Sequence, residues 1–345
     1  MRASQWVRAG LLLVILAFCG YGLYDEWPEI DPWIGQLHVY SIAGSVIAAL
    51  AGSGCMMLAW RVLLADLGSR LPVLVAARVT FVAQLGKYVP GAVWSFAAHV
   101  ELGHDYAVPR RRGAASVIVA LALAVAVGLL IAACALPLAS PAMARRYLFA
   151  LAVVPVIAVC LVPPILHRIL NAALRLIRQE PLEHPLSWRG LAMALGFTAL
   201  GWVMLGLQAW FLLADVARDG PRSLLLALGA YALACSLALL LVIFPNGIGA
   251  REVIMVAALA PVLPRGAALA VAVMARVVTT VSDLTWGGVG LAIARRSRST
   301  GSASRVAGSP VAGRHRKQAG RRAVGLDRQP EQPAAAAQRV PGTAG

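Results

Sequence analysis

The sequence predicts an all-α, polytopic membrane protein. Of its 345 residues, 60% are hydrophobic and only 13% are charged, and the apolar residues form long runs. A soluble chain carries about a quarter of its residues as charged side chains. About 20 apolar residues suffice to cross roughly 30 Å of hydrocarbon. A water-soluble globule is therefore excluded, and a bundle of membrane helices is expected.

Seven apolar runs are long enough to be crossings. They are Val7–Tyr24, Val39–Leu64, Gly113–Leu138, Tyr147–Ile165, Gly190–Ala214, Ser223–Phe244 and Ala267–Ala294. The first resembles a signal peptide, but no small-residue cleavage site follows it, so we expect it to stay. Two shorter stretches, Pro72–Val100 and Gly247–Leu263, are broken by proline and glycine. We predict about seven to eight crossings, with eight favoured, and two broken or re-entrant segments.

Basic residues cluster on one predicted side of the membrane. Arg2 and Arg8 precede the first run, and Arg110–Arg112 precede the third. Asp25 and Glu26, with the acidic residues just after them, fall on the opposite side. Because short cytoplasmic loops are enriched in arginine and lysine, the amino terminus is predicted to be cytoplasmic. Eight crossings would return the carboxyl terminus to the cytoplasm. The expected location is the cell (inner or plasma) membrane.

The last 51 residues differ from the transmembrane domain, residues 1–294. Residues 295–345 carry eleven basic and two acidic side chains and are rich in small and polar residues. Without apolar periodicity they cannot bury enough surface to offset ordering, so a basic, disordered cytoplasmic tail is predicted. Nucleic-acid binding is not expected, because aromatic residues do not interleave with the basic ones.

Metal and cofactor sites are not predicted. The five cysteines lie far apart within apolar runs and lack the C-x-x-C spacing of metal ligands. His99, Glu101, His104 and Asp105 form a polar group after the first broken segment. The two histidines are five residues apart, which puts them on different helical faces, so a loop at the membrane surface is favoured. Glu101 stays a candidate ligand-binding residue because it is nearest to the apolar segment.

The first break is Gly86-Lys87-Tyr88-Val89-Pro90-Gly91. Interrupted backbone at membrane depth requires burial in protein or a water-filled cavity. Lys87 is the only lysine before the tail. Pro90 lacks an amide proton and Gly91 relaxes the backbone, so nearby amides can face an anion together with Lys87. In the alternative interpretation, Lys87 extends to the interface, with Tyr88 and Trp94 as aromatic anchors instead of ligand contacts.

The second break is Pro245-Asn246-Gly247-Ile248-Gly249-Ala250-Arg251-Glu252, and it is typical of a helix start with a flexible entry. Free amides at a helix amino terminus favour an anion such as phosphate. Pro245, Gly247 and Gly249 would shape that entry. Arg251 offers a planar fork for phosphate oxygens, and Glu252 could hold it or accept a proton. An internal Arg251–Glu252 salt bridge or an interfacial turn is the alternative.

The final apolar run contains two charges, Arg276 and Asp283. Seven residues separate them, so they lie about two turns apart on one helical face. Isolated charges in a membrane helix are costly and usually face the protein interior. We expect them to pair with each other through water, with Glu252 or with a ligand; a purely structural pair between helices is the alternative.

The two breaks and Arg276 resemble the lysylphosphatidylglycerol synthase transmembrane region, a flippase-like family of bacterial and archaeal membrane proteins. The resemblance runs from Gly86 to Trp94 and from Pro245 to Glu252, and covers about residues 5–295. Asn246 departs from the pattern, where the family more often has glycine. Members that make aminoacylated lipid carry an additional soluble acyltransferase domain, for which this sequence has no pattern. The resemblance implies lipid handling without aminoacyl transfer.

The predicted function is to bind an anionic lipid or lipid-linked head group, with movement between leaflets as a further step left open. Membrane lipids are the expected partners. One alternative is a polyprenyl-phosphate-dependent glycosyltransferase or another lipid-modifying enzyme, which would use Glu101, Glu252 or Asp283 as base or metal ligand. The sequence favours a non-enzymatic function, because it lacks a D-x-D pair. The other alternative is a non-transporting partner of an envelope-assembly enzyme.

Overall fold

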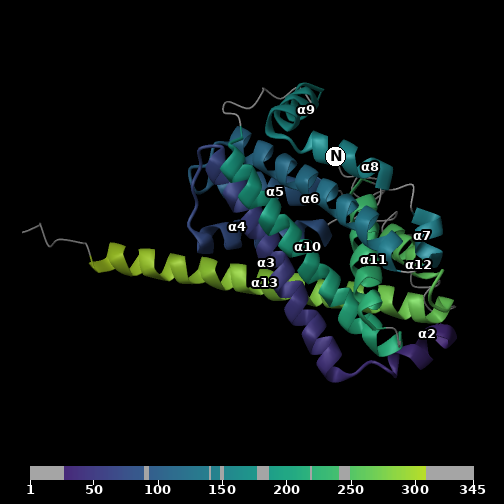
Figure 1. Cartoon of the computed structure of the whole chain (residues 1–345). Coiled ribbons are helices and arrows are strands. Elements are labelled where there is room, and N and C mark those ends of the chain that lie inside the picture. The colour runs from purple at the N-terminus through teal and green to yellow at the C-terminus, as the bar shows by residue number, and fades with distance from the viewer. Residues whose placement is uncertain are drawn as a thin grey trace, which may run out of the picture. The chain divides into compact units, whose positions relative to one another are not determined.

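The computed structural model describes residues 27–88, 93–139, 141–147, 151–176, 186–217, 220–240 and 249–307, and these residues form helices joined by turns (Figure 1). The chain divides into two units, Met1–Arg298 and Ser299–Gly345. All helices discussed below lie in the first unit, except that the last one continues past residue 298. The predicted all-α membrane fold is confirmed.

Five helices among the described residues are long and apolar enough to cross a membrane. They are α3 (Val39–Asp66), α6 (Arg110–Ala139), α10 (Trp188–Val216), α11 (Gly220–Leu240) and α13 (Arg265–Ala307). Each corresponds to one predicted crossing. The predicted first crossing, Val7–Tyr24, lies outside the described residues, and the short helix α2 (Trp27–Ile34) follows it.

The predicted crossing over Tyr147–Ile165 is not one helix. The structure has three short helices there, α7 (Pro141–Tyr147), α8 (Val153–Cys160) and α9 (Pro163–Leu176). Pro163 and Pro164 explain the break between the last two, because proline lacks the amide proton that a helix interior needs and is tolerated in a first turn. This stretch therefore changes direction after α8.

The bundle core is built from small and aliphatic side chains. Helix α3 packs along α10, and α11 packs against both α6 and α10 (Figure 1). A side-chain carbon added at Gly52 of α3 would come within 2.8 Å of Leu205 on α10. The glycine thus permits the close backbone approach that holds membrane helices together. Buried alanines of α13, including Ala268, Ala272 and Ala275, join the same core.

Both predicted breaks interrupt helices. The first lies between α4 (Val73–Leu85) and α5 (Val93–His104), and its described part forms a short 3₁₀ turn, η1 (Gly86–Tyr88). The second precedes α12 (Ala250–Leu259). Four predicted site residues at the breaks, Pro90, Gly91, Pro245 and Gly247, lie outside the described residues.

Helix α4 packs closely against α13 and thereby positions η1. Phe81 stacks on Trp286 with ring centroids 4.4 Å apart and planes within 6°. The indole nitrogen of Trp286 also donates to the Leu50 carbonyl of α3, at 3.0 Å. A side-chain carbon at Gly287 would lie 2.7 Å from Leu85. These contacts bring the end of α4, and with it Lys87, against the middle of α13.

The membrane-spanning part of the last helix ends where predicted. The apolar span over Arg265–Ile293 corresponds to the predicted crossing Ala267–Ala294, and α13 continues beyond it to Ala307. Residues 295–307 are mostly arginine, serine and alanine and contain no proline, which is compatible with a helix. Residues 308–345 of the predicted tail lie outside the described residues.

Candidate functional site

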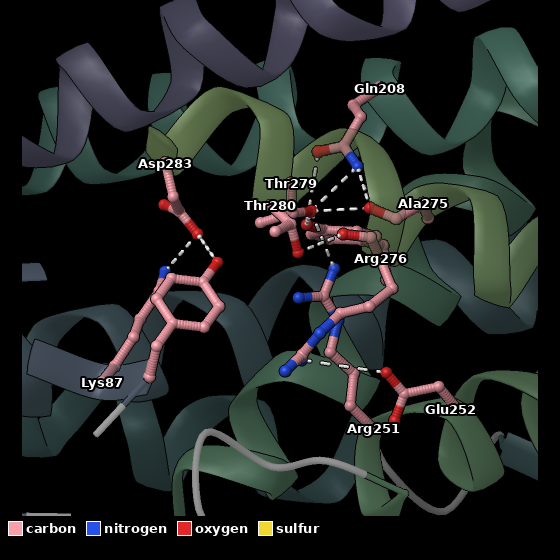
Figure 2. A network of polar contacts seen from close by, with 11 residues as sticks. Lys87, Gln208, Arg251, Glu252, Ala275, Arg276, Thr279, Thr280 and Asp283 are labelled. Atoms are coloured by element: carbon pink, nitrogen blue, oxygen red, sulfur yellow. Dashed lines mark hydrogen bonds and ion pairs between the residues drawn. The ribbon is translucent and has the colours of Figure 1, made fainter. Parts of the chain in front are cut away.

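The first break meets α13 at Asp283. The Lys87 ammonium nitrogen lies 2.5 Å from Asp283 Oδ2 (Figure 2). The Tyr88 hydroxyl donates to the same carboxylate oxygen at 2.7 Å. The Asp283 side chain is 3% exposed and that of Lys87 24%. A buried charge is tolerated when it is paired and hydrogen-bonded, so Lys87 and Asp283 neutralise each other.

The second break begins α12 with a backbone conformation that favours glycine. Gly249 has φ 83°, and its amide donates to Glu252 Oε2 at 2.8 Å. The other Glu252 oxygen, Oε1, lies 3.8 Å from Arg276 Nη1 on α13 (Figure 2). Glu252 therefore caps its own helix and pairs with Arg276, one of the partners expected from the sequence. The alternative was a salt bridge between Arg251 and Glu252. The close contacts of Glu252 are instead with the Gly249 amide and Arg276.

Arg251 makes its close contacts with neutral groups. Its Nη2 donates to the Thr279 hydroxyl at 3.4 Å. Its guanidinium carbon lies 4.5 Å from the centre of the Tyr231 ring, which is the geometry of a cation–π contact. In Figure 2 the Arg251 and Arg276 guanidinium groups lie side by side below α13. Two neighbouring arginines concentrate positive charge beside this part of α13.

Gln208 joins α10 to this region and was missed by the sequence analysis. It is fully buried. Its amide nitrogen donates to the Ala275 carbonyl at 2.8 Å and to the Thr279 hydroxyl at 3.1 Å. Its amide oxygen accepts from the Tyr231 hydroxyl at 3.3 Å. A lone glutamine within a long apolar run was the available signal, since a buried amide needs partners in hydrocarbon.

We call these residues the α13 cluster. They are Lys87, Tyr88, Gln208, Tyr231, Arg251, Glu252, Arg276, Thr279 and Asp283. Three of them are cations and two are carboxylates, so the cluster has a formal charge of +1. Two acids at the ends of other helices have partners of their own: Asp215 accepts from the His38 amide and Asp66 from the Ser187 amide. The cluster therefore favours an anionic ligand.

A comparison with known families supports the resemblance seen in the sequence. The family described as the lysylphosphatidylglycerol synthase TM region matches residues 5–287. The chain belongs to this family. The match includes both breaks and the part of α13 that carries Arg276 and Asp283. No curated protein sequence matches the chain.

Membership of the lysylphosphatidylglycerol synthase TM-region family, together with the apolar helices, identifies a multi-pass integral membrane protein in lipid metabolism. Within this family member the two breaks lie far apart in sequence. Lys87 nevertheless contacts Asp283, and Arg251 contacts Thr279, on neighbouring turns of α13. Thr279 and Asp283 are four residues apart, or about 6 Å along the helix axis. The two breaks thus meet on α13.

Two other predicted site residues have different surroundings in this family member. Trp94 is 52% exposed at the start of α5. Glu101 forms a two-pronged ion pair with Arg110, at 2.9 Å and 2.8 Å, and both side chains are more than half exposed. The hydrogen bond from Arg110, followed by its charge, holds the pKa of Glu101 below its usual value. Glu101, which the sequence analysis kept as a candidate ligand-binding residue, belongs to an exposed pair between α5 and α6, and its ligand-binding role stays a prediction.

The histidines near Glu101 also differ from each other in surroundings. His99 packs edge-on against Trp60, with ring centroids 4.3 Å apart. His104 lies at the end of α5, where its Nδ1 is 3.4 Å from the Val108 carbonyl. Among the residues that the structure describes, no group of three or more histidine, cysteine or acidic side chains is placed to hold a metal ion.

Proposed function

We propose that the protein binds the anionic head group of a membrane lipid at the α13 cluster and moves it between leaflets. The observation that carries this proposal is that three cations from three separate elements meet two carboxylates among the residues that the structure describes. In apolar surroundings an excess positive charge requires an anion. A phosphate group on a lipid supplies one at membrane depth.

Arg251 is the proposed primary contact of the phosphate. Its guanidinium presents several N–H donors in a fixed fork that matches phosphate oxygens. Its close partners, the Thr279 hydroxyl and the Tyr231 ring, orient it without cancelling its charge. The amino terminus of α12 adds the positive end of a helix dipole beside it. Arg276, partly neutralised by Glu252, would be the second contact.

Lys87 is the proposed next contact of the phosphate, after Arg251, as the head group moves between leaflets. Asp283 neutralises Lys87, so a head group arriving there has to compete with that carboxylate. The two contacts are about one helical turn apart on α13. A phosphate could therefore pass from Arg251 to Lys87 without losing contact with a cation, which is how a charged group can move through a low-dielectric region.

The proposal is tested with protein reconstituted into vesicles that contain fluorescent phosphatidylglycerol. Transfer is followed by quenching of the outer-leaflet dye with a membrane-impermeant reductant. We expect Arg251→Gln and Lys87→Gln to abolish transfer. Arg145→Gln is the matched control, because Arg145 is an exposed arginine on α7 outside the cluster. Transfer at the wild-type rate in both cluster variants would refute the proposal.

A parallel binding measurement separates the two parts of the proposal. Short-chain phosphatidylglycerol is titrated into the detergent-solubilised protein. Saturable binding that Arg251→Gln weakens, without transfer in vesicles, would leave a lipid-binding protein that does not translocate. Dimethyl phosphate serves as the second probe, since it carries the same phosphodiester without acyl chains. Binding of the lipid but not of dimethyl phosphate would show that the acyl chains contribute to recognition.

A further inference from the structure

Helix α9 separates its apolar and basic side chains onto opposite faces. Leu166 is 5% exposed and packs into the protein. Arg168 and Arg175 are exposed and seven residues apart, so they share one face. At 100° per residue, that face lies opposite Leu166. Ile169 lies on the border between the two faces and is 44% exposed although it is apolar. This pattern is typical of a helix lying at a membrane surface.

The position of α9 agrees with that pattern. Leu166 belongs to a buried cluster with Leu63 and Leu67 at the end of α3, and with Leu186 and Leu191 at the start of α10. These are the ends of crossing helices, where the chain leaves the hydrocarbon. Figure 1 shows α9 beside the ends of α6 and α10. Helix α9 therefore packs beside the end of α3 and the start of α10.

The ends of α3 and α10 are fixed to each other. Asp66 accepts hydrogen bonds from the Ser187 amide at 2.7 Å and from its hydroxyl at 2.6 Å. The Ser187 hydroxyl in turn accepts from the Gly190 amide at 2.9 Å and caps α10. Trp188, the first residue of α10, is 66% exposed, as expected for an aromatic anchor in the interface.

The length of α9 excludes a crossing. Its 14 residues span about 21 Å, which is less than the roughly 30 Å of hydrocarbon. The preceding helix α8 is apolar, with Val156 60% and Val159 53% exposed, as expected for side chains that face lipid. The turn at Leu161 and Val162, followed by Pro163, then redirects the chain. The apolar helix α8 thus ends directly before the amphipathic helix α9 begins.

We infer that α9 lies in the membrane interface and that its Arg168–Arg175 face binds the phosphate groups of anionic lipids in that leaflet. Each arginine near an anionic surface strengthens binding by about fivefold. This surface is separate from the α13 cluster and does not depend on the proposed function. It would hold anionic lipid around the protein whether or not the protein transports it.

The depth of α9 is tested by spin-label scanning of residues 163–176 after the five native cysteines are replaced. We expect a label at Ile169→Cys to be more accessible to oxygen than to a water-soluble nickel complex. Labels at Arg168→Cys and Arg175→Cys should show the reverse. Equal nickel access at all three positions would overturn the interfacial placement.

The lipid preference is tested by amide hydrogen exchange of α9 in nanodiscs of phosphatidylcholine, with and without added phosphatidylglycerol. We expect added phosphatidylglycerol to slow exchange at least about fivefold in the wild type. The double variant Arg168→Gln/Arg175→Gln should lose this effect, whereas Arg145→Gln and Arg251→Gln should retain it. No slowing in the wild type would overturn the inference. It would leave the proposed function standing, because that rests on Arg251.

Discussion

The two broken segments both contact α13, but their cations have different partners there. Lys87 of the first break lies 2.5 Å from a buried carboxylate that also accepts from Tyr88. Arg251 of the second break makes close contacts with a hydroxyl and an aromatic ring. The first cation is neutralised by the protein itself, and the second keeps its charge available.

This difference assigns different tasks to two motifs that look alike in the sequence. The Asp283 carboxylate fixes the first break to α13 through Lys87 and Tyr88, so removing Asp283 should mainly affect stability. The Arg251 contacts orient a charge without cancelling it, so its loss should mainly affect anion binding. Removing groups at the two breaks should therefore separate stability from binding.

The largest expected effect is on stability, from Asp283→Leu. Removing one member of a buried ion pair leaves the other charge uncompensated and costs about 3 kcal/mol or more. The measurement is the free energy of unfolding in detergent. The double variant Lys87→Met/Asp283→Leu should recover most of the loss, because no buried charge remains. If the single variant is as stable as the wild type, the first break is not held by this pair.

The next largest effect is expected from Gln208→Leu, which should lower both the stability of the protein and its affinity for lipid. The change removes the amide from Ala275, Thr279 and Tyr231 and leaves buried polar groups unsatisfied, at about 2 kcal/mol. Because Thr279 and Tyr231 orient Arg251, affinity for short-chain phosphatidylglycerol should also fall. Lost stability with unchanged affinity would restrict Gln208 to a structural role.

A smaller effect, confined to the second break, is expected from Gly249→Ala. A side chain at φ 83° is strained by about 1–2 kcal/mol. Gly196→Ala on α10 is the matched control, since a side-chain carbon there meets nothing within 4 Å. The control should not lose stability, because alanine is the better helix former. Equal unfolding free energies for the two variants would contradict the glycine requirement at residue 249.

The smallest effect is expected at the exposed Glu101–Arg110 pair. Its hydrogen bond holds the folded-state pKa of Glu101 below the unfolded value. The pair therefore stabilises the fold above the usual glutamate pKa and loses that contribution as pH falls through the lowered folded-state pKa. Glu101→Gln should remove this pH-dependent difference and change little at neutral pH, as is general for exposed pairs. A large loss of stability at neutral pH would contradict the surface assignment.

The fold was predictable where hydrophobicity decides it. Five crossings and both breaks follow from apolar run length and from proline and glycine, because these set where a helix can form in lipid. The stretch over residues 147–165 is apolar throughout, and its composition does not reveal that it forms separate helices. Only Pro163 and Pro164 signal the turn that separates α8 from α9. Composition alone does not fix the direction of a chain after such a turn.

The candidate site was predictable in part. Charges inside apolar runs identified Lys87, Arg251, Glu252, Arg276 and Asp283, because a membrane makes unpaired charge costly. Their pairing was not predictable, since Lys87 and Asp283 are separated by almost two hundred residues. Gln208 and Tyr231 were missed for the same reason: a neutral polar residue in an apolar run shows its role only once its neighbours are known.

The account depends most on an anionic head group lying against the Arg251 guanidinium. Solid-state NMR of the reconstituted protein, with nitrogen-15 in its arginines and phosphatidylglycerol as the only phosphorus source, measures this contact directly. We expect phosphorus to dephase an arginine nitrogen signal that Arg251→Gln removes and Arg145→Gln leaves in place, as direct hydrogen bonding to phosphate requires. Phosphorus dephasing that is identical in the wild type and Arg251→Gln would contradict the account.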